Sequence, residues 1–112
     1  MTPQDRETDA RADAQEMCAI ARRIASLGSA RFTDSHDPLV RLAAKALVLD
    51  LAAALERAPD WRDEQPVLWR GLKRTRDRFA DHYQDLQYDV LWEVVTDDFP
   101  AVDATLGQRG GP

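Results

Sequence analysis

Residues 69–92 read WRGLKRTRDRFADHYQDLQYDVLW, and this stretch decides the fold. An α-helix turns by about 100° per residue, so side chains that recur every three or four positions share one face. One arc of roughly 100° on such a helix carries an apolar stripe that a single cation interrupts: Trp69, Leu72, Arg76, Phe79, Ala80 and Tyr83. A guanidinium keeps its charge, so burying Arg76 is costly unless an anion meets it. The stripe therefore predicts a helix whose arginine pairs either with a carboxylate or with a phosphate that a ligand brings.

The segments before this helix carry two further helical patterns. Apolar residues recur at helical spacing from Ala10 to Leu27, and Gly28 ends the pattern. Asp37 and Pro38 are typical of a helix start, as the N-cap and the first helical residue. We expect the second helix to run to about residue 58 and to be apolar on nearly every side. Such a helix is suited to burial against its own domain and against another subunit.

The rest of the chain also favours helices. A polar connector that begins at Pro59 leads to Pro66, which opens the third helix. Asp89 is placed to cap a short fourth helix, Pro100 breaks its pattern, and residues 101–106 form a last turn. No strand pattern or repeat is present. The sequence therefore predicts an all-α fold, an antiparallel bundle of four to five helices.

Size and charge limit the kind of protein. With 112 residues, of which 44% are hydrophobic, the chain can bury one core and is too short for two domains. We expect a single domain over residues 8–106, between flexible termini at 1–7 and 107–112. The net charge of −5 argues against holding nucleic acid by the overall field, because such domains are strongly basic. Any nucleic-acid site must therefore be local.

The few cysteine and histidine residues of the chain argue against an internal disulfide and against a metal-binding motif. A single cysteine, Cys18, cannot form an internal disulfide and is expected to be a small core residue. No signal peptide and no apolar run of 18 residues is present, so the sequence predicts a cytoplasmic protein with no membrane span. The two histidines, His36 and His82, stand apart and form no metal-binding motif. We expect no metal ion and no other cofactor.

A longer pattern surrounds the stripe. Six residues separate Trp69 from Arg76, eight separate Tyr83 from Trp92, and Glu93 and the segment 96–100, TDDFP, follow. In these spacings the sequence resembles the HepT-like branch of the HEPN domains, small helical proteins found as toxins beside minimal nucleotidyltransferases. The resemblance covers about residues 8–106 and needs no gap within the motif. It implies a HEPN-type bundle that forms a homodimer.

One position departs from the family pattern. The histidine of the family falls on Asp81, while the histidine of this chain, His82, comes one residue later. A looser HEPN pattern, Arg followed after four to six residues by His, is still met by Arg76 and His82. The departure separates an active member of the family from a degenerate one.

The resemblance implies a metal-independent endoribonuclease whose site is completed across the dimer. Such cleavage needs a base for the 2′-hydroxyl proton, an acid for the leaving oxygen and a cation for the charge of the transition state. Arg76 has the chemistry of the cation, and the alternative is a structural arginine paired with a buried carboxylate. His82 has the chemistry of the acid or base, and the alternative is a solvated or interface histidine, since a one-residue shift turns a side chain by about 100°. Asp81, ionised at neutral pH, donates no proton and repels a phosphate.

Two further features concern partners. The resemblance implies that Tyr83 is the residue that a cognate MNT-type nucleotidyltransferase antitoxin adenylylates, and the apolar stripe also suits a core or interface tyrosine. Four cations surround Arg76 in the only local basic cluster of the sequence: Arg70, Lys73, Arg74 and Arg78. They form either an RNA-backbone track or a solvated face that Asp77 and Asp81 partly neutralise.

The sequence therefore predicts a HepT-like HEPN toxin of a toxin–antitoxin pair, an endoribonuclease that uses Arg76 and His82. The alternative is a catalytically degenerate HEPN module, with Asp81 at the histidine position, that binds a partner nucleotidyltransferase or RNA without cleaving.

Overall fold

The fold is all-α, as the sequence predicts. The computed structural model describes residues 2–34, 36–81 and 88–107, and this part of the chain contains no strand. Its elements are α1 (Pro3–Ser26), α2 (Ser29–Phe32), α3 (Leu39–Glu56), α4 (Pro59–Glu64), α5 (Pro66–Asp81), α6 (Tyr88–Glu93), the π-helical turn η1 (Val94–Asp98) and α7 (Phe99–Leu106). None of the described helices is long and apolar enough to cross a membrane.

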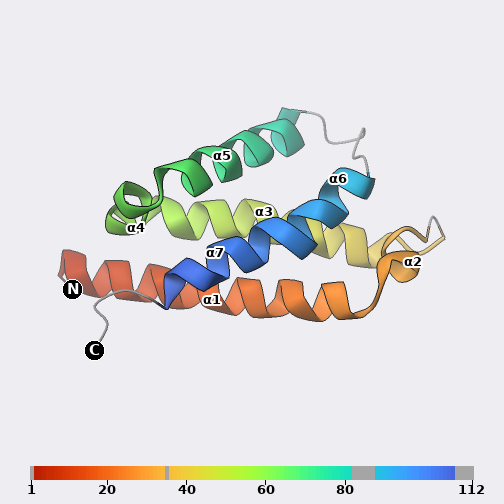
Figure 1. Ribbon diagram of the computed structural model, residues 1–112, viewed down its shortest axis with the longest axis horizontal. Coiled ribbons are helices and arrows are strands. Elements are labelled where there is room, and N and C mark those ends of the chain that lie inside the picture. The colour runs from red at the N-terminus through yellow and green to blue at the C-terminus, as the bar shows by residue number, and fades with distance from the viewer. Residues whose placement is uncertain (1, 35, 82–87, 108–112) are drawn as a thin grey trace.

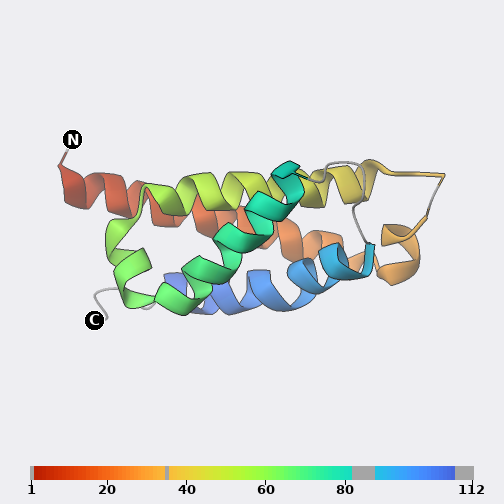
Figure 2. The same ribbon diagram turned by 90° about the horizontal axis from the view of Figure 1, so that it is seen from above.

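Three long helical stretches form the body of the bundle. α1 and α3 lie side by side, η1 and α7 pack along α1, and α6 contacts α3 and α2 (Figure 1). Small buried residues on α1, such as Ala10, Ala14 and Ala21, let these helices approach closely. α5 crosses α3 at an angle and packs against it and α4 (Figure 2).

α1 begins earlier than the sequence predicts. Residues 3–7, which we expected in a flexible terminus, form its first turns. The Thr2 hydroxyl accepts a hydrogen bond from the Asp5 amide at 3.1 Å, and the Asp5 carboxylate accepts one from the Thr2 amide at 3.2 Å. This reciprocal cap satisfies two amides that a helix start leaves open. Gly28, with a φ of 88°, follows the end of α1 as expected.

The start of the second predicted helix is correct to within one residue. α3 begins at Leu39, and its N-cap residue is Pro38. The Asp37 carboxylate still supplies the cap, because it accepts a hydrogen bond from the Leu39 amide at 3.2 Å. α3 ends at Glu56 and not near residue 58, a difference within the usual fraying of helix ends.

The polar connector predicted at Pro59 is wrong, because these residues form the helix α4. Glu7 of α1 is only 2% exposed. Its carboxylate accepts hydrogen bonds from two amides at the start of α4, that of Asp60 at 3.0 Å and that of Trp61 at 3.4 Å. Arg11 donates to Glu7 at 3.0 Å and to Glu64 at 3.1 Å. A carboxylate at a helix N-terminus is stabilising, so contacts with a residue 53 and 54 positions earlier in the sequence explain a helix that the local pattern did not indicate.

The predicted break at Pro100 is also wrong. The helical path continues from α6 through η1 into α7, with Pro100 in the first turn of α7. A proline lacks an amide hydrogen and clashes with the carbonyl four residues earlier in a regular α-helix. Here the Phe99 amide donates to the carbonyl of Val94, five residues earlier. This wider turn accommodates the proline without ending the helix.

Candidate functional site

Arg76 lies in the second half of α5, and carboxylates meet it. Its side chain is 31% exposed; its Nη1 lies 3.6 Å from Oε2 of Glu56 on α3, and its Nη2 lies 3.0 Å from Oδ1 of Asp77. The side chains of Glu56 and Asp77 are 56% and 61% exposed. Exposed ion pairs of this kind contribute little to stability. An incoming phosphate can therefore compete with both carboxylates for the guanidinium.

The apolar stripe faces the core, and Arg76 lies at its edge. Leu72 and Phe79 are 7% and 2% exposed, and Trp69 is half-buried. The rings of Trp69 and the fully buried Trp61 meet edge to face, with centroids 6.5 Å apart. Ala80, which the sequence places in the same stripe, is exposed. The stripe thus fixes the rotation of α5 on α3 and leaves the guanidinium accessible.

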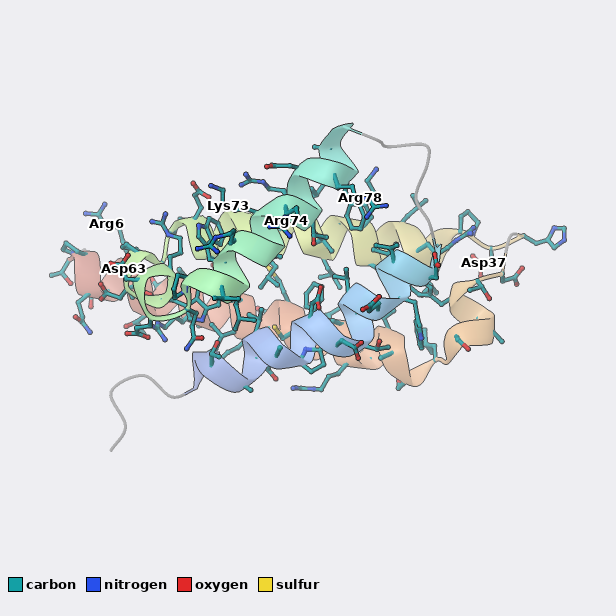
Figure 3. The ribbon with its side chains drawn as sticks, turned by 45° about the horizontal axis from the view of Figure 1, so that its top comes forward. Arg6, Asp37, Asp63, Lys73, Arg74 and Arg78 are labelled. Atoms are coloured by element: carbon teal, nitrogen blue, oxygen red, sulfur yellow. The ribbon has the colours of Figure 1, made fainter. Side chains whose placement is uncertain are left out.

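The four cations around Arg76 are all exposed. Lys73, Arg74 and Arg78 extend from α5 in Figure 3. Lys73 lies 5.9 Å from the centroid of the Trp69 ring, a cation–π contact, and Arg62 lies 5.5 Å from the same ring. Among the described residues, Arg70, Arg74 and Arg78 form no ion pair. Asp77, expected to neutralise this cluster, pairs with Arg76.

The basic cluster does not converge on Arg76. At about 100° per residue, Arg74 and Arg76 point about 160° apart around the helix axis. Arg70, Arg74 and Arg78 follow one row, whereas Arg76 turns toward the end of α3, where it meets Glu56. α5 therefore carries two separate basic features on different sides.

The part of the family motif that contains the histidine lies mostly outside the residues that the structure describes. Asp81 is the last residue of α5, and His82 and Tyr83 lie outside the described residues. The structure thus brings Arg76 together with Glu56 and Asp77. The roles of His82, Asp81 and Tyr83 stay predictions.

A cavity of about 280 Å³ lies on the other side of α5, between this helix, α3 and the η1–α7 stretch. Its walls are mainly apolar, and they include Leu51, Leu72 and Phe99. Two lining residues carry opposite charges, Arg74 on α5 and Asp98 on η1. Burial raises the pKa of Asp98 above its usual value, and the negative charges of Glu93 and Asp97 add to the shift.

Sequence reasoning missed Asp98 and Gly71, which also line this cavity. Asp97 and Asp98 are adjacent and chemically alike, and of the two only Asp98 lines the cavity, at helical spacing from Val94 and Val102. Gly71 was visible as a glycine inside a strong helical pattern, where it costs helix stability and can therefore mark a functional position.

α3 also differs from the helix that we expected. Its buried side includes Arg41 and Lys45, which are 6% and 5% exposed, and burial lowers the pKa of Lys45. Its exposed side is mostly apolar: Leu39, Leu42, Ala43, Ala46, Asp50 and Ala53. Leu39 and Leu42 are 67% and 48% exposed. The prediction of an apolar surface outside the protomer core therefore holds for this side, but the helix is not apolar all round.

Comparison with known proteins identifies the family. The family profile described as "Ribonuclease HepT-like" matches residues 7–108, which confirms the resemblance indicated by the sequence. A protein of Methanocaldococcus jannaschii named "Putative RNase MJ0127" is 31% identical over 52 residues, which are 45% of this chain and 43% of that protein. The chain thus spans less than half of this curated relative. No solved structure matches the chain at a significant level.

Proposed function

The chain belongs to the ribonuclease HepT-like family, and from this premise we propose that it is the toxin of a toxin–antitoxin pair and cleaves RNA without a metal ion. The observation that carries the proposal is Arg76, a partly exposed guanidinium held at the edge of an apolar stripe by two exposed carboxylates. The M. jannaschii relative named as an RNase supports the same reaction class. We place this reaction in the cytoplasm.

Arg76 supplies the cation of the reaction. Its planar fork of N–H donors matches the oxygens of a phosphate, and it keeps its charge at every physiological pH. The scissile phosphate displaces Glu56, and the guanidinium stabilises the charge that builds up on the pentacoordinate phosphorus. His82 takes the proton of the 2′-hydroxyl or returns one to the leaving oxygen. Asp81 stands where the family has histidine and takes no part in proton transfer.

A second copy of the chain completes the site in this proposal. The exposed side of α3 is apolar except for Asp50, and α3 presents Leu39 and Leu42 to solvent. Isolated chains seldom leave such a surface uncovered, and a two-fold dimer covers it with its own copy. Glu56, the partner of Arg76, borders this surface at the end of α3. The homodimer therefore brings Arg76 close to the subunit boundary.

The antitoxin of this proposal is an MNT-type nucleotidyltransferase that adenylylates Tyr83. The adenylate brings a phosphate to the segment that follows α5, where charge-assisted hydrogen bonds to arginines hold it against RNA. Intact mass spectrometry after co-expression with the transferase should show added adenylate on the wild type and none on Tyr83→Phe. An unchanged mass with full inhibition would mean that the antitoxin acts by binding alone.

Asp81 favours a second candidate, a degenerate module that binds RNA or the nucleotidyltransferase without cleaving. A carboxylate at the histidine position removes the family's proton donor and adds repulsion toward phosphate. The two candidates differ in one measurable property, the cleavage of RNA by the pure protein.

Cleavage of single-stranded RNA in EDTA tests the proposal. We expect the wild type to cut, Arg76→Ala to lose all cleavage, and His82→Ala to lose most of it. Arg23→Ala is the matched control, because Arg23 is an exposed arginine in the last turn of α1. If the wild type leaves RNA intact while Asp81→His cleaves it, the degenerate module is the correct candidate.

A further inference from the structure

Gly71 lines the cavity beside α5, although nothing in the fold requires a glycine there. It lies inside α5, its φ is not positive, and a Cβ added to it would meet no atom within 4 Å. Glycine in a helix interior costs about 1 kcal/mol relative to alanine. A bare backbone facing open space is the arrangement that lets a ligand approach closely. Gly71 thus keeps one wall of the cavity free.

A regular row of cations runs along α5, the helix that forms one wall of the cavity. Arg70, Arg74 and Arg78 are spaced four residues apart, so the rise of an α-helix places them about 6 Å apart along its axis. All three are exposed, and none forms an ion pair with a described residue. The spacing is comparable to that of consecutive phosphates along a single nucleotide strand. Arg74 belongs both to this row and to the cavity lining.

The opposite wall offers a hydrogen-bond acceptor above an apolar floor. Asp98 of η1, an exposed residue, lines the cavity together with the apolar residues Leu72, Val94 and Phe99. The volume of about 280 Å³ is at the lower limit for pockets that hold drug-sized ligands, about 300–1,000 Å³. It suits one planar ring system. An ionised carboxylate has two acceptor oxygens and no donor, so it matches a ring edge with two adjacent N–H donors.

We propose that this cavity is a base pocket for single-stranded RNA that accepts one guanine. The N1–H and amino group of the guanine donate to Asp98, and the flanking phosphates lie on Arg70, Arg74 and Arg78. The inference rests on the proposed function in taking RNA as the ligand. It also goes further, because Arg76 lies about 140° around the helix axis from Gly71. The guanine in the pocket is therefore an anchor at a fixed distance from the nucleotide that is cut.

A short 2′-O-methyl oligouridine that carries a single guanosine tests the pocket, because it resists cleavage. We expect the wild type to bind it about tenfold more tightly than the all-uridine strand, the size of one bidentate base contact. Asp98→Asn should lose this preference, and Arg74→Gln should weaken both strands alike. Fluorescence anisotropy measures the affinities. Amide chemical shifts of Gly71 and Thr75 should move with the guanosine strand.

Gly71→Met fills the cavity and should also abolish the preference. Its Cβ meets open space, and methionine forms helices better than glycine, so the variant should keep its helical circular dichroism. Ala104→Met is the matched control, because it adds the same side chain to an exposed site of α7 outside the cavity lining.

Each outcome separates the pocket from the reaction. A wild type that binds the guanosine strand selectively but cleaves nothing keeps the pocket and loses the ribonuclease. A wild type that cleaves RNA but binds both strands alike, or a Gly71→Met protein that keeps the preference, overturns the pocket. Gly71→Met that binds RNA normally but fails to bind the nucleotidyltransferase would assign the cavity to that protein and also overturn the proposal.

Discussion

At the scale of single residues, Glu7 has a large expected effect on stability. Its buried carboxylate accepts from the amides of Asp60 and Trp61 and pairs with Arg11, which is itself 4% exposed. Glu7→Ala would leave the charge of Arg11 buried with Glu64 alone, so we expect a loss of about 3–5 kcal/mol. Urea unfolding measures it. Glu64→Ala is the control, since that side chain is 52% exposed and should cost about 1 kcal/mol or less; equal losses in both variants would contradict the argument.

Cys18 should make stability depend on pH at the alkaline end. Burial, with the charge of Asp103 adding and that of Arg22 opposing, raises the pKa of its thiol from 9.0 to about 12. The unfolded chain then ionises first, so the stabilising contribution is complete below pH 9 and is lost as the pH rises toward 12, by up to about 1.4 kcal/mol per pH unit. Urea midpoints at pH 8 and pH 11 should fall further for the wild type than for Cys18→Ala. Parallel falls would show that the thiol is not responsible.

The residues of the site differ in how far the sequence could predict them. The helical period alone places Arg76 in the apolar stripe and requires an anion for it. It could not identify Glu56, 20 residues earlier, because that contact depends on how α5 crosses α3. Asp98 was beyond prediction for a similar reason, since the cavity that it lines forms only where α5, α3 and the η1–α7 stretch meet.

At the scale of elements, period and capping predicted α1, α3 and α5 well, because each of these helices has a strong local pattern. The sequence pattern did not predict α4, because this helix is stabilised by a hydrogen bond to Glu7 of α1 and not by its own sequence. The sequence pattern also did not predict the continuous helical stretch from α6 to α7, because a proline normally ends a helix. The π turn before Pro100, which accommodates the proline, is seen only in the folded backbone.

The exposed apolar side of α3 leads to a testable prediction about the proposed homodimer. Leu42 is 48% exposed within an apolar surface, and a carboxylate there would have to be buried unpaired in the proposed dimer. Leu42→Glu should therefore be monomeric, with the helical content of the wild type. Light scattering should find the wild type at twice the protomer mass of 12.6 kDa. Leu27→Glu, at a residue that is 50% exposed after α1, should stay dimeric, and a monomeric wild type at micromolar concentration would count against the composite site.

At the scale of the whole molecule, the proposed function requires an acidic protein to bind an acidic polymer. The net charge of −5 repels RNA at a distance, and salt screens that repulsion as well as the attraction of the local arginines. In the proposal above, the attraction comes from the row Arg70, Arg74 and Arg78 together with Arg76. The binding of RNA should therefore depend on salt like that of a protein with few phosphate contacts.

The salt dependence of RNA binding gives a quantitative form to this view. Single strands lose about 0.7 of a log unit of affinity per log unit of salt for each phosphate neutralised. Three to four arginine contacts thus predict a slope of about −2 to −3 for an uncleavable RNA between low and physiological salt, and Arg70→Gln or Arg78→Gln should each reduce the slope by about 0.7. Fluorescence anisotropy across a sodium chloride series provides the measurement. A slope near zero would exclude binding of RNA phosphates by this row of arginines. An unchanged slope in both variants would mean that other residues of the molecule bind the phosphates.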